Sequence, residues 1–201
     1  MKESIEIIVP ENWADVSLKS YQNYISKIND LKGEDEIVIH SISSLCNIPL
    51  KLIKHLKRED IKQLYTKLSN LISLPINKQV IDKIDIGGIK YGFHPNLDEM
   101  TLGEFVDLDE HCKDGVDSIQ QVLAILYRPI TEEKGNNYNI EPYNETHIQN
   151  ARLFENLSID FANGVMVFFY HLGSELLTSS QGYLEEEVER LLHEGTMVGS
   201  A

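Results

Sequence analysis

The stretch that decides the fold runs from Tyr91 to Ile130 and reads YGFHPNLDEMTLGEFVDLDEHCKDGVDSIQQVLAILYRPI. It predicts a strand, a proline-bounded loop, a capped helix and a second apolar helix in direct succession. It contains no glycine-rich phosphate loop, no nucleophile elbow and no residues at metal-ligand spacing. Such a layout is typical of a scaffold, and we expect a protein that is not an enzyme.

Two local signals frame this stretch. Residues 80–94 alternate on either side of Gly87-Gly88, the permissive pair that a tight β-hairpin turn needs. Thr101 is followed three positions later by Glu104, which is the pattern of a capping box at the start of a helix. The sequence therefore predicts a β-hairpin at about 80–94 and a helix that begins after Thr101.

The second helix is predicted over residues 114–127, where apolar residues recur at three- and four-residue spacing. Arg128-Pro129 should end it, with the Arg128 guanidinium hydrogen-bonded to the last carbonyl groups of the helix. The polar residues 131–139 predict a surface loop.

Residues 1–78 predict a strand followed by helices. Ser4 to Val9 alternates and stops at Pro10, as a short strand does, and Ser17 is a good N-cap for the next helix. Further helices are expected from Glu36, Pro49 and Arg58, the last two forming a helical hairpin.

Three helices are predicted to finish the chain, at about 145–156, 158–178 and 181–194. The middle one is apolar on nearly all sides, with Phe161, Val165 and Phe168 among its members, and should lie at the centre of the core. We therefore expect an α+β fold, mostly helical, in which short strands and a β-hairpin pack with six to eight helices. Its two regions would be residues 1–78 and an acidic domain over residues 79–201.

Charge is unevenly distributed along the 201 residues, whose net charge is −14. Residues 1–80 hold 11 Lys+Arg and 10 Asp+Glu, a charge of +1, whereas residues 81–201 hold 7 and 22, a charge of −15. An acidic field repels phosphates, so direct nucleic-acid binding is not expected and a basic protein partner is favoured. The apolar runs are too short to span a membrane, and the N-terminus does not resemble a secretion signal.

The candidate catalytic and metal-ligating residues do not form a recognisable site. His111-Cys112 and the neighbouring acids fit no zinc-ligand spacing, and nothing frames Cys112 as an activated nucleophile. Cys46 and Cys112 should be reduced and partly buried. We expect no cofactor, no metal and no catalytic residue.

Two charge clusters are the candidate partner-binding sites, although each also fits a solvated helix face. One is basic and the other acidic. They comprise Lys51, Lys54 and Arg58, within a larger set of basic residues on the helical hairpin, and Glu185, Glu186 and Glu187 near the C-terminus.

Four blocks carry a resemblance to a known family: KYGFHPNLDEMTLGEFVDLDEH, VLAILYRPI, NIEPYNE and VMVFFYHLGSELL. Together they resemble small proteins encoded among the structural and morphogenesis genes of tailed bacteriophages, over about residues 84–178. The resemblance implies a virion component of the tail, neck or capsid, or an assembly chaperone that the virion does not retain. It assigns no site residues.

The expected partners are accordingly other phage structural or morphogenesis proteins, or further copies of this chain. The expected location is the host cytoplasm during assembly and then the virion. An acidic nucleic-acid mimic that inhibits a host defence protein is a third hypothesis. It ranks lower because core helices interrupt the acidic residues.

Overall fold

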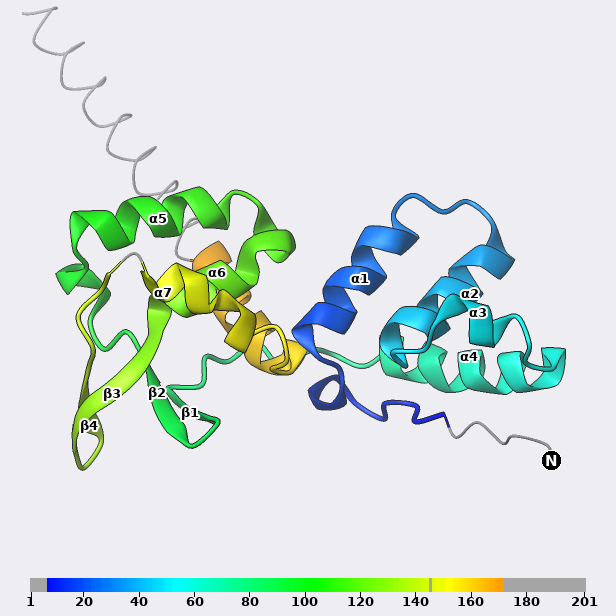
Figure 1. Cartoon of the computed structure of the whole chain (residues 1–201), viewed down its shortest axis with the longest axis horizontal. Helices are drawn as coiled ribbons and strands as arrows, with labels where there is room; N and C mark the ends of the chain where they lie inside the picture. The colour runs from blue at the N-terminus through cyan, green and yellow to red at the C-terminus, as the bar shows by residue number, and fades with distance from the viewer. Residues whose placement is uncertain (1–6, 145, 172–201) are drawn as a thin grey trace, which may run out of the picture. The chain divides into compact units, whose positions relative to one another are not determined.

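A computed structural model describes residues 7–144 and 146–171 of the chain (Figure 1). It divides into two compact units, residues 1–166 and residues 167–201. The described part is α+β and mostly helical, as predicted. The predicted boundary between residues 78 and 79 stays a prediction. None of the described helices has the length and apolar character needed to cross a membrane.

The N-terminal part of the first unit is a group of helices that begins where the sequence predicted. The Ser17 side chain accepts a hydrogen bond from the Ser20 backbone N–H and caps the first α-helix. Residues 7–9 form no strand, so that prediction is wrong over its described part, because no other strand lies beside them to pair with. The elements are η1 (Trp13–Asp15), α1 (Leu18–Ile28), α2 (Glu34–Leu45), α3 (Leu50–Ile53) and α4 (Arg58–Ile72).

These helices bury apolar residues and expose charged ones. Leu18, Ile42 and Leu68 are completely buried, one each from α1, α2 and α4. The Trp13 indole N–H donates to the Leu74 carbonyl oxygen at 2.9 Å, which ties the start of the chain to the end of α4. This part therefore has the usual arrangement, in which the hydrophobic effect holds amphipathic helices together.

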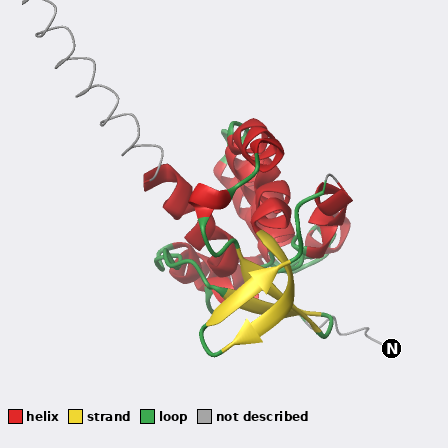
Figure 2. Cartoon of the chain, turned by 90° about the vertical axis from the view of Figure 1, so that its left-hand side faces the viewer, coloured by secondary structure: helices red, strands yellow, loops and turns green. Residues whose placement is uncertain are grey.

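The sheet has four antiparallel strands in the order β1-β2-β3-β4 and stands in the foreground of Figure 2, with helices behind it. Gly87 and Gly88 have φ values of 63° and 85° and turn β1 into β2, as predicted. The glycine at position 92 is required by a close approach, because a Cβ atom there would lie 2.3 Å from the ring of Tyr138. The strands are β1 (Lys83–Ile86), β2 (Ile89–Phe93), β3 (Tyr127–Lys134) and β4 (Asn137–Ile140).

Residues 131–139 do not form the predicted loop. They form most of a β3–β4 hairpin that turns at Gly135, where φ is 63°. The prediction was wrong because residues 131–137 are exposed in the hairpin, and an exposed strand can be as polar as a loop. The Tyr138 hydroxyl donates to the Phe93 carbonyl oxygen at 2.8 Å and fastens β4 across β2.

Helices and short 3-10 segments complete this part of the unit. The core centres on Tyr127, whose ring contacts those of Phe93, Phe154 and Phe161. The elements are η2 (Leu97–Glu99), α5 (Leu102–Cys112), η3 (Gly115–Ser118), α6 (Ile119–Leu126), α7 (Thr146–Gln149) and η4 (Asn150–Leu153), followed by a helical run over residues 159–171.

Two predicted helices differ from the observed ones, and a third, predicted at 158–178, lies partly outside the described residues. The helix expected at 114–127 is α-helical only from Ile119, and the one expected at 145–156 is divided into α7 and η4. The predicted central helix is present over 159–171, with Phe161 and Val165 buried but Phe168 only half-buried in the second unit. The helix predicted at 181–194 lies outside the described residues.

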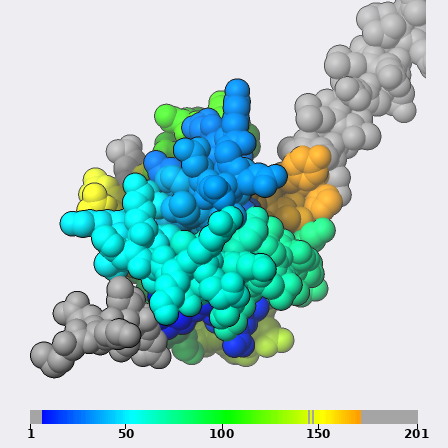
Figure 3. Space-filling model, turned by 90° about the vertical axis from the view of Figure 1, so that its right-hand side faces the viewer, coloured from blue at the N-terminus to red at the C-terminus, as the bar shows by residue number. Residues whose placement is uncertain are grey.

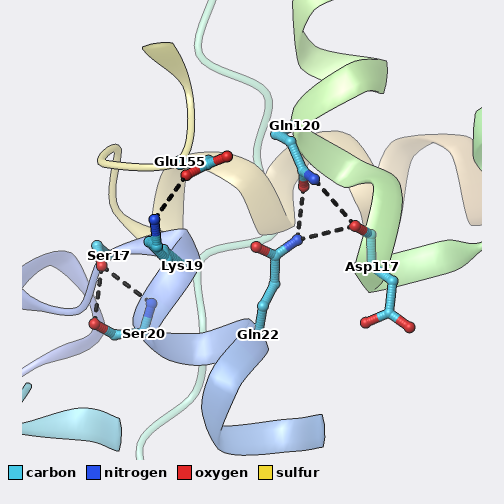
Figure 4. Close-up of polar contacts among 7 residues, drawn as sticks. All are labelled: Ser17, Lys19, Ser20, Gln22, Asp117, Gln120 and Glu155. Atoms are coloured by element: carbon cyan, nitrogen blue, oxygen red, sulfur yellow. Dashed lines mark hydrogen bonds and ion pairs between the residues drawn. The ribbon is translucent and has the colours of Figure 1, made fainter. Parts of the chain in front are cut away.

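Polar contacts join α1 to residues that come much later in the chain (Figure 4). The Gln22 amide donates to the Val116 carbonyl and to the Gln120 side chain, both at 2.7 Å. Lys19 pairs with Glu155 at 3.1 Å, and the Leu18 backbone N–H donates to the Leu157 carbonyl at 2.7 Å. These contacts fix α1 to η3, to α6 and to residues 155–157, which follow η4.

Candidate functional site

Helix α5 begins with the capping box that the sequence predicted. The Thr101 hydroxyl accepts a hydrogen bond from the Glu104 backbone N–H at 3.3 Å, and the Glu104 carboxylate accepts one from the Thr101 backbone N–H at 2.6 Å. Two N–H groups that a helix start leaves without partners are thus satisfied. The box also points the Glu104 side chain back over the start of the helix.

Glu104 is buried, with only 2% of its surface exposed, and it pairs with two basic side chains from the sheet. Its Oε1 atom lies 2.7 Å from Nη2 of Arg128 and 3.6 Å from Nε2 of His94. Arg128 is 3% exposed and lies on β3 opposite Gly92, while His94 directly follows β2. We call Glu104, Arg128 and His94 the buried anchor of α5.

Arg128 is a structural polar anchor, as predicted, but the predicted partner, the end of the preceding helix, is wrong. Helix α6 ends at Leu126 and the chain passes directly into β3, so Arg128 does not hydrogen-bond the helix end as expected. An arginine in this buried strand requires an anion, because an unpaired buried charge is costly. Glu104 supplies that anion from α5.

The surroundings set the protonation states of the anchor. Burial would raise the pKa of Glu104, but hydrogen bonds from Thr101 and the charges of Arg128 and His94 outweigh it and lower the pKa. Burial lowers the pKa of His94, and Arg128 lowers it further against the opposing effect of Glu104 and Glu99. At neutral pH the carboxylate is charged, the imidazole is neutral, and the Glu104–Arg128 ion pair carries the attraction.

The opposite side of α5 exposes apolar side chains to solvent. Leu102, Phe105 and Val106 are 78%, 59% and 52% exposed, and their spacing places them on one stripe of the helix. Glu104 and Leu108 occupy the buried side. Over its first turns, α5 therefore has the opposite of the usual amphipathic arrangement. A carboxylate is buried, and a leucine, a phenylalanine and a valine face solvent. We call Leu102, Phe105 and Val106 the α5 patch.

Acidic residues surround the α5 patch. Asp109 continues the same stripe toward the C-terminal end of the helix, and Asp98 and Glu99 lie on η2, which two residues separate from α5. Asp98, Glu99, Asp109 and Glu110 are all exposed, and only Asp109 has an ion-pair partner among the described residues, namely Lys113 at 2.6 Å. The rim of the patch is therefore negatively charged.

A further contact holds the side of α5 against the chain that follows the sheet. The Tyr143 hydroxyl donates to the Asp107 carboxylate, and the Tyr143 ring lies 5.8 Å from the Arg128 guanidinium. One aromatic residue thereby contacts both the helix and the anchor beneath it. Helix α5 is held in place before any partner arrives.

The predicted partner-binding residues lie elsewhere or beyond the described residues. Lys51 is on α3, Lys54 directly follows it and Arg58 begins α4, and all three are exposed. None of the three forms an ion pair within residues 7–144 and 146–171. Glu185, Glu186 and Glu187 lie outside the described residues.

The residues considered as metal ligands do not converge. No group of three or more His, Cys, Asp or Glu side chains that could hold a metal ion occurs in the described part of the chain. His94 belongs to the buried anchor. Cys46 is half-buried as predicted, but Cys112, the last residue of α5, is exposed, so the prediction that it is partly buried is wrong. Partial desolvation of the thiol and the nearby Asp109 carboxylate raise the pKa of Cys112, which disfavours a reactive thiolate.

Comparison with known proteins yields no matching family model, no matching curated protein and no matching solved structure. The resemblance to tailed-phage proteins therefore stays a prediction. The proposals below depend on the chemistry and geometry of this chain.

Proposed function

We propose that this chain is a non-enzymatic component of a tailed-phage particle that acts through protein–protein contacts. The observation that carries the interaction role is the α5 patch, an exposed apolar stripe on a helix held by a buried ion pair. The phage setting comes from the resemblance of residues 84–178 to phage structural and morphogenesis proteins.

The energetics favour docking at the α5 patch. Burying one large apolar side chain contributes about 1.5–3 kcal/mol, so three on one stripe can form the centre of an interface. The buried anchor already holds the helix in place, so a partner does not have to order it on binding. Preorganisation of this kind lowers the entropy cost of association.

The acidic rim selects the chemistry of the partner. Asp98, Glu99 and Glu110 favour a protein surface on which apolar residues are flanked by Lys or Arg. A neighbouring copy could supply Lys51, Lys54 and Arg58 from its own helices, and another phage protein could supply an equivalent basic face. Contact between two acidic patches would be opposed by charge repulsion.

Site-specific photo-crosslinking tests this proposal. p-Benzoylphenylalanine would replace Phe105 in the protein produced during infection, and the control would carry the same group in place of Lys134, exposed near the β3–β4 turn. We expect a phage structural or morphogenesis protein, or a second copy of the chain, to be captured from position 105 only. Capture of the same proteins from both positions, or of a host defence protein, would contradict the proposal.

Purified virions distinguish the structural component from the assembly chaperone. A structural component should be present in fixed copy number, whereas a chaperone should be absent from the particle. Charge reversal of Glu185, Glu186 and Glu187 tests separately whether the C-terminal acidic cluster contributes to the contact.

A further inference from the structure

A cavity of about 330 Å³ that is open to solvent lies among α1, α2 and the start of α3. Figure 3 shows the surface that α2, α3 and α4 form in this part of the molecule. The elements that line the cavity are different from those that form the α5 patch. Its lining residues are Asn23, Lys27, His40, Ser43, Ser44, Asn47, Ile48, Pro49 and Leu50.

Helical spacing explains why polar groups gather at this cavity. Asn23 and Lys27 are one turn apart on α1. On α2, His40, Ser43 and Ser44 follow at three- and four-residue spacing and form a polar stripe that Asn47 continues just past the helix. Two neighbouring helices thus contribute polar side chains to one hollow.

A turn that follows α2 lines part of the cavity, and two hydrogen bonds hold it in place. The Ser43 hydroxyl donates to the Ile48 carbonyl oxygen at 2.7 Å, and the Ile48 backbone N–H donates to the Ser43 carbonyl oxygen at 2.9 Å. Between them, Asn47 adopts a left-handed conformation with φ of 51°, which asparagine tolerates better than most residues. The turn that carries Ser44 and Asn47 therefore keeps its conformation without a ligand.

The remaining polar groups are accessible to solvent, since Asn23, Lys27 and Asn47 are exposed and His40 and Ser44 are half-buried. Within the described residues, no ion pair or side-chain hydrogen bond engages Lys27, His40 or Asn47. An ammonium group supplies three donors, an amide two and an imidazole at least one when protonated on the appropriate nitrogen. A ligand that accepts several hydrogen bonds could therefore take the place of solvent at these groups.

The charge of the cavity is opposite to that of the whole protein. The chain holds 32 acidic residues, yet none of them lines the cavity, which holds one lysine and one histidine. Lys51 follows Leu50 on α3 and Lys54 directly follows the helix, so two further positive charges lie close to Leu50 along the chain. The nearest acidic residue along α2 is Glu36, one turn before His40 and outside the lining.

We propose that this cavity binds a small ligand through an oxyanion group, a phosphate or a carboxylate. Lys27 supplies the charge, while the amides of Asn23 and Asn47 and the Ser44 hydroxyl orient the oxygen atoms. His40 adds a donor from α2. The site is independent of the α5 patch, because the two share no residue.

Titration of the ¹⁵N-labelled protein with inorganic phosphate, and separately with citrate, tests the site and distinguishes the two oxyanions. We expect saturable chemical-shift changes centred on residues 23–27 and 40–50. Lys27→Gln should weaken binding by about tenfold or more, because it removes a charge-assisted contact. The matched control Lys62→Gln removes the same charge from an exposed position on α4 that does not line the cavity.

A second variant, His40→Gln, tests whether a lining residue other than Lys27 contributes to anion binding. It should also weaken binding, while the unfolding curves of all three variants should match that of the parent. Saturation by only one of the anions would support the site and identify its ligand class. Absence of saturation by both anions, or equal weakening by Lys27→Gln and Lys62→Gln, would overturn the proposal.

Discussion

Helices α4 and α5 bury different kinds of side chain. Helix α4 buries Leu68 and Leu71 and exposes its charged residues, as amphipathic helices normally do. Helix α5 buries Glu104 along with Leu108 and exposes Leu102, Phe105 and Val106. Packing alone accounts for α4. An ion pair must help to hold α5, which leaves its apolar side chains available for another molecule.

The largest expected effect is the loss of the buried carboxylate. Glu104→Gln should destabilise the protein by about 3–5 kcal/mol, because Arg128 would remain charged and buried without its counter-ion. Leu68→Ala on α4 should cost a similar amount, about 2–5 kcal/mol, through loss of apolar packing. Urea unfolding would measure both variants.

The control for that comparison is Asp109→Asn, which changes an exposed carboxylate on the same helix. Its pair with Lys113 is exposed and screened by solvent, so the change should cost far less than Glu104→Gln. Equal losses from Glu104→Gln and Asp109→Asn would mean that the buried anchor does not hold α5.

Acidification should weaken the anchor in two stages. The pKa of His94 is lowered from its ordinary value of 6.5 by burial and by Arg128, against Glu104 and Glu99. The unfolded chain therefore takes up this proton first, and stability should begin to fall as the pH drops below about 6.5. The pKa of Glu104 is also lowered, so its contribution is present above its ordinary value of 4.5 and is lost as the pH falls through its folded value.

Thermal melts of the parent and of His94→Gln across this pH range would separate the two stages. The variant should lose the first stage and keep the second. A parent whose stability rises between pH 7 and pH 5 would contradict the protonation states assigned to the anchor.

Removal of the helix cap should have a smaller effect. Thr101→Ala should lower the free energy of unfolding by about 0.5–2 kcal/mol, because the Glu104 backbone N–H loses its acceptor. Thr101→Ser keeps the hydroxyl and should be nearly silent. Calorimetric melts of the two variants test this, and equal losses would assign the effect to the threonine methyl group.

The smallest effect on stability is expected on the outer side of the same helix. Phe105→Ser should change the free energy of unfolding by less than about 0.5 kcal/mol, because the side chain is mostly exposed. Phe161→Ala, in the core beside Tyr127, is the contrasting variant and should cost about 3–5 kcal/mol. A large loss of stability from Phe105→Ser would mean that the patch belongs to the fold.

Much of the local structure could be predicted from the sequence. The Ser17 cap, the turn at Gly87-Gly88 and the Thr101–Glu104 capping box each depend on residues close together in the chain. Such signals are local, because side-chain and backbone groups within a few residues of one another decide them.

The candidate site could be predicted only in part, because it depends on contacts distant in sequence. The capping box indicated where α5 starts, but nothing near Glu104 indicates that Arg128 would lie 2.7 Å away from it. The same limit led to Arg128 being assigned to a helix end and residues 131–139 to a loop. A helical projection of α5 does place Leu102, Phe105 and Val106 on one side, but only the buried anchor shows that this side faces solvent.

Co-purification from infected cells tests the docking account most directly. The tagged parent would be compared with Phe105→Ser and with Leu52→Ser, which changes an exposed leucine on α3. The account predicts that a phage protein or a second copy of the chain is retained by the parent and by Leu52→Ser and lost by Phe105→Ser. Retention should also weaken with salt, because the Debye length falls from about 10 Å at 0.1 M to about 3 Å at 1 M. Recovery of the same partner with all three proteins would contradict the docking role of α5.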